Sequence, residues 1–482
     1  MSEVTNTEKH SFKKSLNLLD STAIVVGSMI GSGIFIVSAD MARNLGSPGW
    51  LMVAWVITGI LTIIAAISYG ELASMMPHAG GQYVYLREAY NPLTGFLYGW
   101  TLFLVIQTGT IAAVAMAFAK FSGVLMPWFS EKNIILNLGF IKFNSVQLLA
   151  IFSIFILTLV NLRGVSKAKV VQNIFTFTKV GALVGLIIVG LLYAKNSHTI
   201  EVNSKIFWDL MPPNSTFTIS GFTIITALGT AMVGSIFASV AWDNITFTAG
   251  EVINPKKNIP LSLFFGTTIV IGLYLLANTV YIQALPLRGL ESGTTVFEKG
   301  MQFATNDRVG TSAMSVLFGD SAAIIMAVFI MISTFGCNNG LILSGARVYY
   351  AMAKDGLFFR RAGELNDKSV PGTGLIIQSV WASVLCLSGT YSDLLDYVVF
   401  AVLLFYVLAI ISIFVLRKKR PDAERPYKAF GYPVLPAIYI LAAVIIMVIL
   451  LINKPLYTFP GLIIVLLGIP VYFIWRKVNK IS

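Results

Sequence analysis

The chain has few of the residues that carry most enzyme and metal chemistry. Its 482 residues include two cysteines, Cys337 and Cys386, and three histidines, His10, His78 and His198. Both cysteines lie in apolar stretches, so the sequence offers neither a disulfide framework nor a thiolate metal cluster. A glycine-rich phosphate-binding loop ending in Lys-Ser or Lys-Thr is also missing, which argues against an ATP-driven pump. We therefore expect no cofactor, no metal site and no redox chemistry.

Charged residues are scarce as well. They make up 12% of the chain, against 56% hydrophobic residues, and the mean hydropathy is +0.80. This composition excludes a water-soluble enzyme and indicates an integral membrane protein. The net charge of +12 is spread over short loops such as 417–420. There it suits anionic lipid headgroups, so we expect no nucleic-acid partner.

Twelve apolar segments reach the roughly 20 residues that a helix needs to cross about 30 Å of hydrocarbon. The predicted spans are 18–43, 48–76, 92–121, 145–162, 169–194, 220–249, 260–286, 320–351, 370–390, 393–416, 433–453 and 456–475. Placing the N-terminus in the cytoplasm puts most of the 34 Lys and Arg residues on the inner side, as the positive-inside rule requires. The N-terminal segment lacks the apolar core of a secretory signal, so we expect the mature chain to start at Met1.

Two of these spans are interrupted at mid-depth. Residues 27–35 of the first span carry three glycines, each of which costs about 1 kcal/mol in a helix relative to alanine. A break there would leave the amides of 31–33 at a helix N-terminus, suited to a carboxylate, and the carbonyls near Met29 and Ile30 suited to an ammonium. A small-residue stripe for close helix packing is the alternative. Residues 234–244 of the sixth span interrupt its apolar run in a similar way.

Matched interruptions five spans apart indicate an internal repeat. Since five is odd, the second copy enters the membrane from the opposite side, which predicts an inverted pair with a site between spans 1 and 6. The expected domains are a cytoplasmic tail (1–17), a first repeat (18–194), a second repeat with its preceding extracellular loop (195–416), and two further helices with a short cytoplasmic C-terminus (417–482).

Several short motifs follow one another along most of the chain. They are Gly-Ser-Gly-Ile-Phe (31–35), Gly-Glu-Leu-Ala (70–73), Pro77, Gly-Gly-Gln-Tyr-Val-Tyr (80–85), Gly-Glu-Val-Ile-Asn-Pro-Lys-Lys-Asn-Ile-Pro (250–260), Ser-Gly-Ala-Arg (344–347), Asp-Gly (355–356), Arg-Pro-Tyr-Lys (425–428) and Gly-Tyr-Pro (431–433). In this order they resemble the motifs of the amino acid–polyamine–organocation transporters, especially bacterial members related to the L-type amino-acid exchangers. The resemblance implies an all-α, leucine-transporter-like fold of twelve transmembrane helices, with a five-plus-five inverted repeat and broken helices 1 and 6.

The resemblance also implies a central amino-acid site. The substrate carboxylate would meet Ser28 and the amides of 31–33, while the ammonium would meet carbonyls of the two broken helices. Phe237 matches the aromatic residue that closes over bound substrate, whereas Val240 or Ala241 stands where the family usually has glycine. The predicted substrate-binding residues are Ser28, Met29, Ile30, Gly31, Ser32, Gly33, Thr110, Phe237, Ala238 and Val240.

Lys179 is the only basic residue deep within a predicted span, where burial of its charge costs at least about 2.5 kcal/mol. A lysine in a span can pair with helix-end carbonyls or extend to the interface. By resemblance, it matches a lysine whose ammonium takes the place of Na⁺ beside the first broken helix. Tyr274 matches a tyrosine that works with that lysine. We therefore expect transport that does not depend on sodium.

Other polar or aromatic residues in the spans have competing explanations. Asp243 would cap the half-helix after the second break or carry a proton, and we favour the cap. Thr110 aligns with a substrate-facing position but would also serve as helix-helix contact. Phe400 would wall the side-chain pocket or simply pack in the core. Glu71 and Arg347 lie at cytoplasmic ends and would form ion pairs of an inner gate.

These features predict a secondary transporter of neutral L-amino acids that exchanges substrates by alternating access, without a covalent step. Proton-coupled symport, with Lys179 or Asp243 titrating, is the alternative within transport. A membrane-embedded sensor or enzyme is the alternative of another class, and the lack of histidine, thiolate or carboxylate clusters at membrane depth argues against it.

Heteromeric L-type relatives are linked to an ancillary glycoprotein through a cysteine in the loop between spans 3 and 4. The corresponding loop here, 122–144, contains no cysteine. We therefore expect no disulfide-linked ancillary subunit, and we expect the chain to lie in the inner membrane of a bacterium with an amino acid and the lipid bilayer as its partners.

Overall fold

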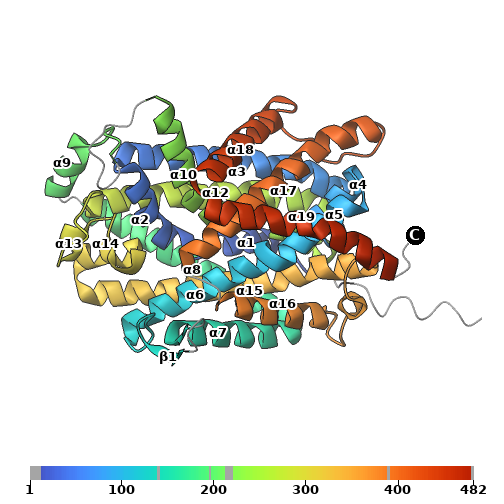
Figure 1. Ribbon diagram of the computed structural model, residues 1–482, viewed down its shortest axis with the longest axis horizontal. Helices are drawn as coiled ribbons and strands as arrows, with labels where there is room; N and C mark the ends of the chain where they lie inside the picture. Colours follow the sequence, from blue (N-terminus) through green and yellow to red (C-terminus); the bar gives the residue numbers. More distant parts are fainter. Residues whose placement is uncertain are drawn as a thin grey trace, which may run out of the picture.

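Long helices dominate the computed structural model, which describes residues 12, 14–137, 142–194, 197–211, 221–387 and 391–478. Ten of the helical segments are long and apolar enough to cross a membrane by length and composition. Several of them, including α6 (Gln107–Leu125), α7 (Ser145–Leu162), α15 (Asp320–Lys354) and α19 (Pro455–Val478), run roughly along the longest axis of the molecule in Figure 1. The described part of the chain is thus an almost entirely helical, polytopic membrane protein.

The first half of the chain forms α1 (Leu18–Met29), α2 (Gly33–Leu45), α3 (Pro48–Met75), α4 (Gln82–Ala89), α5 (Pro92–Thr101), the π-helix η2 (Leu102–Ile106), α6 (Gln107–Leu125), β1 (Ile134–Asn137), β2 (Lys142–Asn144), α7 (Ser145–Leu162), α8 (Val165–Tyr193), α9 (Ser197–Lys205) and α10 (Phe222–Ser239). The second half forms α11 (Asn244–Phe247), η3 (Ala249–Glu251), α12 (Pro255–Ala284), α13 (Val296–Lys299), η4 (Thr305–Asp307), α14 (Val309–Phe318), α15 (Asp320–Lys354), η5 (Arg360–Gly363), α16 (Gly372–Leu385), α17 (Tyr391–Lys419), α18 (Val434–Asn453) and α19 (Pro455–Val478).

Local sequence signals determine where several helices begin. The Asn17 side chain accepts from the Asp20 amide, and the Asp20 carboxylate accepts from the Asn17 amide in return, which closes a capping box on α1. Asn144 and Gln147 form the same arrangement on α7. At α3, Ser47 caps the helix and proline follows at its first position, where no amide is needed. These caps satisfy amides that would otherwise be unpaired at the helix ends.

Two predicted spans are built differently from the expectation. The range 220–249 contains α10, a non-helical stretch and the short α11, while the range 370–390 contains the 14-residue α16, with 388–390 outside the described residues. The loop 122–144 also carries an antiparallel hairpin of β1 and β2 that its sequence did not indicate. Short strands in an exposed loop lack the apolar alternation that would have identified them.

The interior of the bundle is formed by helices that are far apart in the chain. Helix α3 packs against α12, α2 against α10, α1 against α12 and α8, and α15 against α6 and α8. Figure 1 shows α9, α13, α14 and β1 gathered at one end, with α4 and the last residues of α19 at the other. This packing brings the residue stretches 27–35 and 234–244 together inside the bundle.

Candidate functional site

The first interruption separates α1 from α2. Helix α1 ends at Met29, α2 begins at Gly33, and Ile30 has an extended conformation (φ −74°, ψ 90°). The Gly31 amide donates to the Met29 carbonyl at 2.8 Å, so that it closes a local turn. Ser28 Oγ is buried and has no hydrogen-bond partner among the described residues. The stretch therefore presents an unpartnered hydroxyl next to buried main-chain groups that lie outside regular helix.

The second interruption separates α10 from α11. Helix α10 ends at Ser239, Val240 is extended, and α11 begins at Asn244. Ala241 has φ 67°, a left-handed conformation that non-glycine residues adopt only at a cost of about 1–2 kcal/mol. The chain therefore leaves the helix here without the glycine that is usual in the family it resembles. Ser239 Oγ and Asn244 Nδ2 are buried without a partner in the described part of the chain.

The two interruptions touch each other. A Cβ atom added to Gly33 would lie 2.6 Å from the Cβ and 2.8 Å from the Cα of Ala238, so only glycine fits this approach. The Tyr274 hydroxyl, on α12, lies 2.9 Å from the Met29 carbonyl oxygen and 3.1 Å from that of Ala238. One hydroxyl thus bridges the main chains of both interruptions.

A lysine from α8 fills the other side of the first interruption. Lys179, whose side chain is almost fully buried, donates from Nζ to the Gly27 carbonyl and, at 2.8 Å, to the Ile30 carbonyl. Ser333 Oγ donates to the same Ile30 oxygen at 3.2 Å, and Cys337 Sγ donates to the Ser28 carbonyl at 3.0 Å. The ammonium therefore occupies a cluster of main-chain oxygens of the kind that also coordinates a monovalent cation.

Asp243 does not cap α11. Its side chain makes no capping hydrogen bond, and Oδ1 instead accepts from the Tyr406 hydroxyl of α17 at 2.8 Å. The preference for a cap was therefore wrong. The reason is that the helix is only four residues long, while a tyrosine from another element lies within reach of the carboxylate.

Asp243 and Asn244 line a small cavity of about 20 Å³ between α6, the second interruption and α17. A space of this size holds about one water molecule. Thr110 also lines it, but its hydroxyl donates to the Ile106 carbonyl at 2.6 Å, one turn back along the chain. Phe400 is buried and is not among the lining residues. The cavity beside the second interruption is therefore too small for an amino acid side chain in this conformation.

Sequence reasoning missed several of these contacts. Ser333 and Cys337 lie one helical turn apart on α15, and both reach main-chain oxygens of the first interruption. Ser239 and Asn244 were visible only as small or polar residues in an apolar run. The π-helix η2, which directly precedes Gln107, has no distinctive sequence signal, although such bulges are frequent at functional sites.

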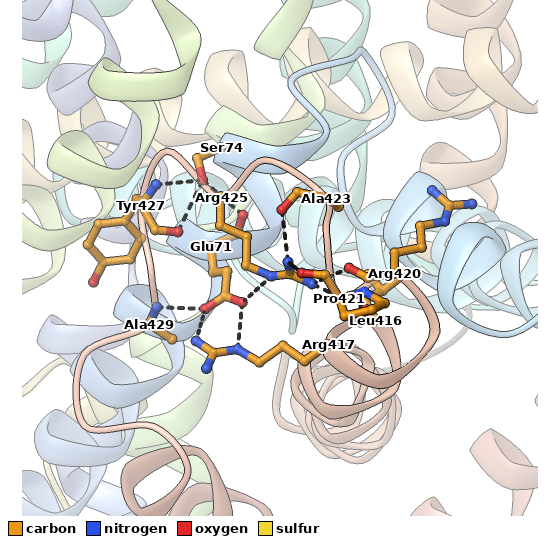
Figure 2. Close-up of polar contacts among 10 residues, drawn as sticks. All are labelled: Glu71, Ser74, Leu416, Arg417, Arg420, Pro421, Ala423, Arg425, Tyr427 and Ala429. Atoms are coloured by element: carbon orange, nitrogen blue, oxygen red, sulfur yellow. Dashed lines mark hydrogen bonds and ion pairs between the residues drawn. The ribbon is translucent and has the colours of Figure 1, made fainter.

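Ion pairs join helices at the end that carries α4. Arg347 and Glu251 pair at 3.0 Å with 0% and 2% of their side chains exposed. Figure 2 shows Glu71 at the centre of a second cluster. Its carboxylate accepts from Arg417 through two bonds of 2.9 and 2.7 Å, and from the Ala429 amide at 2.7 Å. Arg425 Nε lies 3.4 Å from the same carboxylate, so Glu71 and Arg347 belong to two separate ion-pair clusters.

Replacing Glu71 with glutamine is expected to lower the free energy of unfolding by about 2 kcal/mol. This is less than the ~3–5 kcal/mol typical of a fully buried pair, because the closer partner, Arg417, is partly exposed and the buried partner, Arg425, is 3.4 Å away. The melting temperature of the detergent-purified protein measures this. Glu201→Gln is the control, because Glu201 pairs with Lys205 on an exposed surface and should leave the melting temperature unchanged. Equal melting temperatures for the Glu71 variant and the wild type would contradict a structural role for this cluster.

Comparison with known proteins places this geometry in context. A family model described as amino acid permease matches residues 16–474. The large neutral amino acids transporter small subunit 2 of Homo sapiens is 29% identical over 478 residues, which cover 98% of this chain and 82% of that protein. The Asc-type amino acid transporter 1 of Mus musculus is 28% identical over 485 residues, covering 98% and 84%. The cystine/glutamate transporter of Homo sapiens is 27% identical over 474 residues, covering 98% and 87%.

One expectation is contradicted by these relatives. We predicted from the cysteine-free loop 122–144 that the chain has no disulfide-linked ancillary subunit. A relative that aligns with 98% of this chain is named a small subunit and is thus a component of a larger assembly. The prediction was wrong because it inferred the absence of a partner from one loop.

Proposed function

Because the chain belongs to the amino acid permease family, we propose that it is a sodium-independent exchanger of neutral L-amino acids. The family makes it an amino acid transporter and not an enzyme. The names of two relatives refer to large neutral amino acids and to cystine with glutamate. A neutral substrate fits the site best, because its charged side chains, Lys179 and Asp243, are already bound by other groups.

The observation that carries sodium independence is the position of Lys179 Nζ. It donates to two carbonyls of the first interruption, so a fixed ammonium supplies the positive charge among these oxygens. A mobile cation is then not needed to hold the α1–α2 junction in its broken form. Tyr274 adds the link to the second interruption, and substrate binding would act on the same junction.

The proposed substrate position lies where the interruptions meet. The carboxylate would take the Ser28 hydroxyl, which has no partner among the described residues, and the amides at the start of α2. The ammonium would approach the main-chain oxygens near Phe237 and Val240, at the end of α10. Because the adjoining cavity is small, the side chain requires the helices to move apart, as alternating access implies.

The proposed architecture is the five-plus-five inverted repeat over 18–194 and 195–416, with the broken helices as spans 1 and 6. Its support is that the two interruptions occupy corresponding positions, five spans apart, and contact each other. We also propose that both termini are cytoplasmic and that the membrane is the inner membrane of a bacterium, on the distribution of Lys and Arg.

Counterflow in proteoliposomes tests the proposal. Vesicles loaded with an unlabelled neutral amino acid should take up radiolabelled substrate at the same initial rate in sodium chloride and in choline chloride, and empty vesicles should take up little. Exchange requires internal substrate, because the binding site turns back to the outside only when it carries a substrate molecule. Accumulation in empty vesicles driven by an inward pH gradient would instead establish proton symport. A steep dependence on sodium would contradict the role given to Lys179.

A further inference from the structure

A large apolar groove lies outside the transport site, on the flank formed by α3, α12, the segment that precedes α18 and the first turn of α18. Its volume is about 1050 Å³. Ile60 and Ile67 of α3, Phe264 of α12, and Phe430 and Leu435 contribute to its walls. Ile60 is 54% exposed and Phe430 is 73% exposed, although both are apolar. A concave apolar surface of this size on a membrane protein offers space for a hydrocarbon chain.

Two lysine side chains lie at one end of this groove. Lys256 and Lys257 line it and belong to the first turn of α12, which begins at Pro255. The preceding residue, Asn254, makes no side-chain cap, so the positive end of a 30-residue helix adds to the two ammonium charges. A groove that is apolar along its length and cationic at one end matches an anionic amphiphile.

One acidic residue competes for this position. Lys256 Nζ pairs with Glu424 at 2.8 Å, but both side chains are at least half exposed, and such pairs contribute only about 0–1 kcal/mol. Lys257 forms no ion pair within the described ranges. A phosphate group can therefore bind between the two lysines without breaking a strong interaction.

Hydrogen bonds from α3 fix the segment before α18, which forms one wall of the groove. Glu71 binds Arg417 and the Ala429 amide, and Ser74 Oγ accepts from the Tyr427 amide at 3.3 Å, as drawn in Figure 2. A Cβ on Gly70 would lie 2.9 Å from the Tyr427 ring, so α3 and this segment are in close contact. The groove is thus preformed, which reduces the ordering cost of binding.

We propose that this groove binds an anionic phospholipid, with one acyl chain along α3 and α12 and the phosphate over Lys256 and Lys257. The two lysines on the first turn of α12, at the positive end of the helix dipole, recognise the phosphate, and the apolar walls recognise the chain. The lipid would link α12 to the segment before α18. Since α12 also carries Tyr274, the ligand contacts a helix of the transport site at a distance from the substrate.

The test is native mass spectrometry of the full-length, detergent-purified protein titrated with phosphatidylglycerol or phosphatidylcholine of the same acyl chains. We expect the wild type to retain phosphatidylglycerol in preference. The double variant Lys256→Ala/Lys257→Ala should lose this preference, and Lys256→Arg/Lys257→Arg should keep it. The control Lys354→Ala/Lys368→Ala removes two exposed lysines outside the groove and should bind as the wild type does.

A second variant tests the apolar part. Ile60→Trp fills the groove and should reduce binding of both lipids, whereas Leu441→Trp, at an exposed apolar position on α18, should not. Equal retention of the two lipids by the wild type would overturn the proposal. So would unchanged binding in the double alanine variant or in Ile60→Trp. A change of oligomeric state in Ile60→Trp without loss of lipid would show that a second copy of the chain occupies the groove, and would also overturn it.

Discussion

Replacing Lys179 with alanine is expected to reduce amino acid uptake by about 30-fold or more. The substitution leaves the Gly27 carbonyl, inside the bundle, without this donor, while the Ile30 carbonyl keeps only Ser333 Oγ at 3.2 Å. Each buried acceptor left unpaired costs about 1–3 kcal/mol, and ~2 kcal/mol corresponds to about 30-fold in the population of the competent conformation. Initial rates of counterflow, normalised to the amount of reconstituted protein, measure the effect.

The control for this prediction is Lys120→Ala. Lys120 belongs to α6 and pairs with Glu131 at 3.4 Å near the hairpin, so its loss should leave the rate close to that of the wild type. Lys179→Arg is a second comparison, because it keeps the charge but changes its shape. If Lys179→Ala transports at the wild-type rate in choline, the lysine is not needed at the first interruption and the basis for sodium independence fails.

Replacing Gly33 with alanine is expected to reduce uptake at least fivefold. The added methyl group would overlap the Ala238 backbone, which must move away and separate the two interruptions. Overpacking of this kind costs about 1–3 kcal/mol, which is about 5- to 150-fold in an equilibrium. Because Tyr274 spans both main chains, the same shift would also lengthen its hydrogen bonds. Counterflow and the melting temperature are the measurements.

Gly272→Ala is the matched control, since a Cβ on Gly272 of α12 would meet no atom within 4 Å. It makes the same chemical change in a membrane helix and should preserve the rate, with equal or higher stability because alanine favours the helix. Full activity of Gly33→Ala would mean that the two interruptions separate freely, and it would remove the contact on which the proposed substrate position depends.

The sequence predicted the helical membrane architecture because a continuous apolar segment of about 20 residues can satisfy its backbone hydrogen bonds within a bilayer only as a helix. It also identified the stretches around Gly31 and Phe237, since small and polar residues interrupt such runs visibly. It did not indicate which side chains would meet there. Lys179 was noticed as the only basic residue deep within a predicted span, and its role and Tyr274 were identified through resemblance. Ser333 and Cys337 carry no signal, because a serine or cysteine in a span is as common in packing contacts.

Partners that are distant in the chain were equally hidden. Glu71 was expected to form an ion pair. Its partner, Arg417, could not be predicted, because it depends on how α3 and α17 cross. Asp243 shows the reverse error. Its place before a half-helix suggested a local cap, yet the tertiary fold provides the Tyr406 hydroxyl instead. The local sequence indicates which hydrogen bonds a polar side chain can make, and tertiary packing then determines which of them forms.

The left-handed backbone of Ala241 has a consequence for the direction of movement. An alanine held at φ 67° would relax if residues 240–243 rewound into one continuous helix. The backbone at Ala241 is therefore strained, and the hydrogen bonds of Tyr274 to the Ala238 carbonyl and of Tyr406 to Asp243 hold it in this conformation. When those hydrogen bonds break, the strain at Ala241 favours a continuous helix. This preference is stronger than it would be with glycine, which adopts a positive φ at little cost.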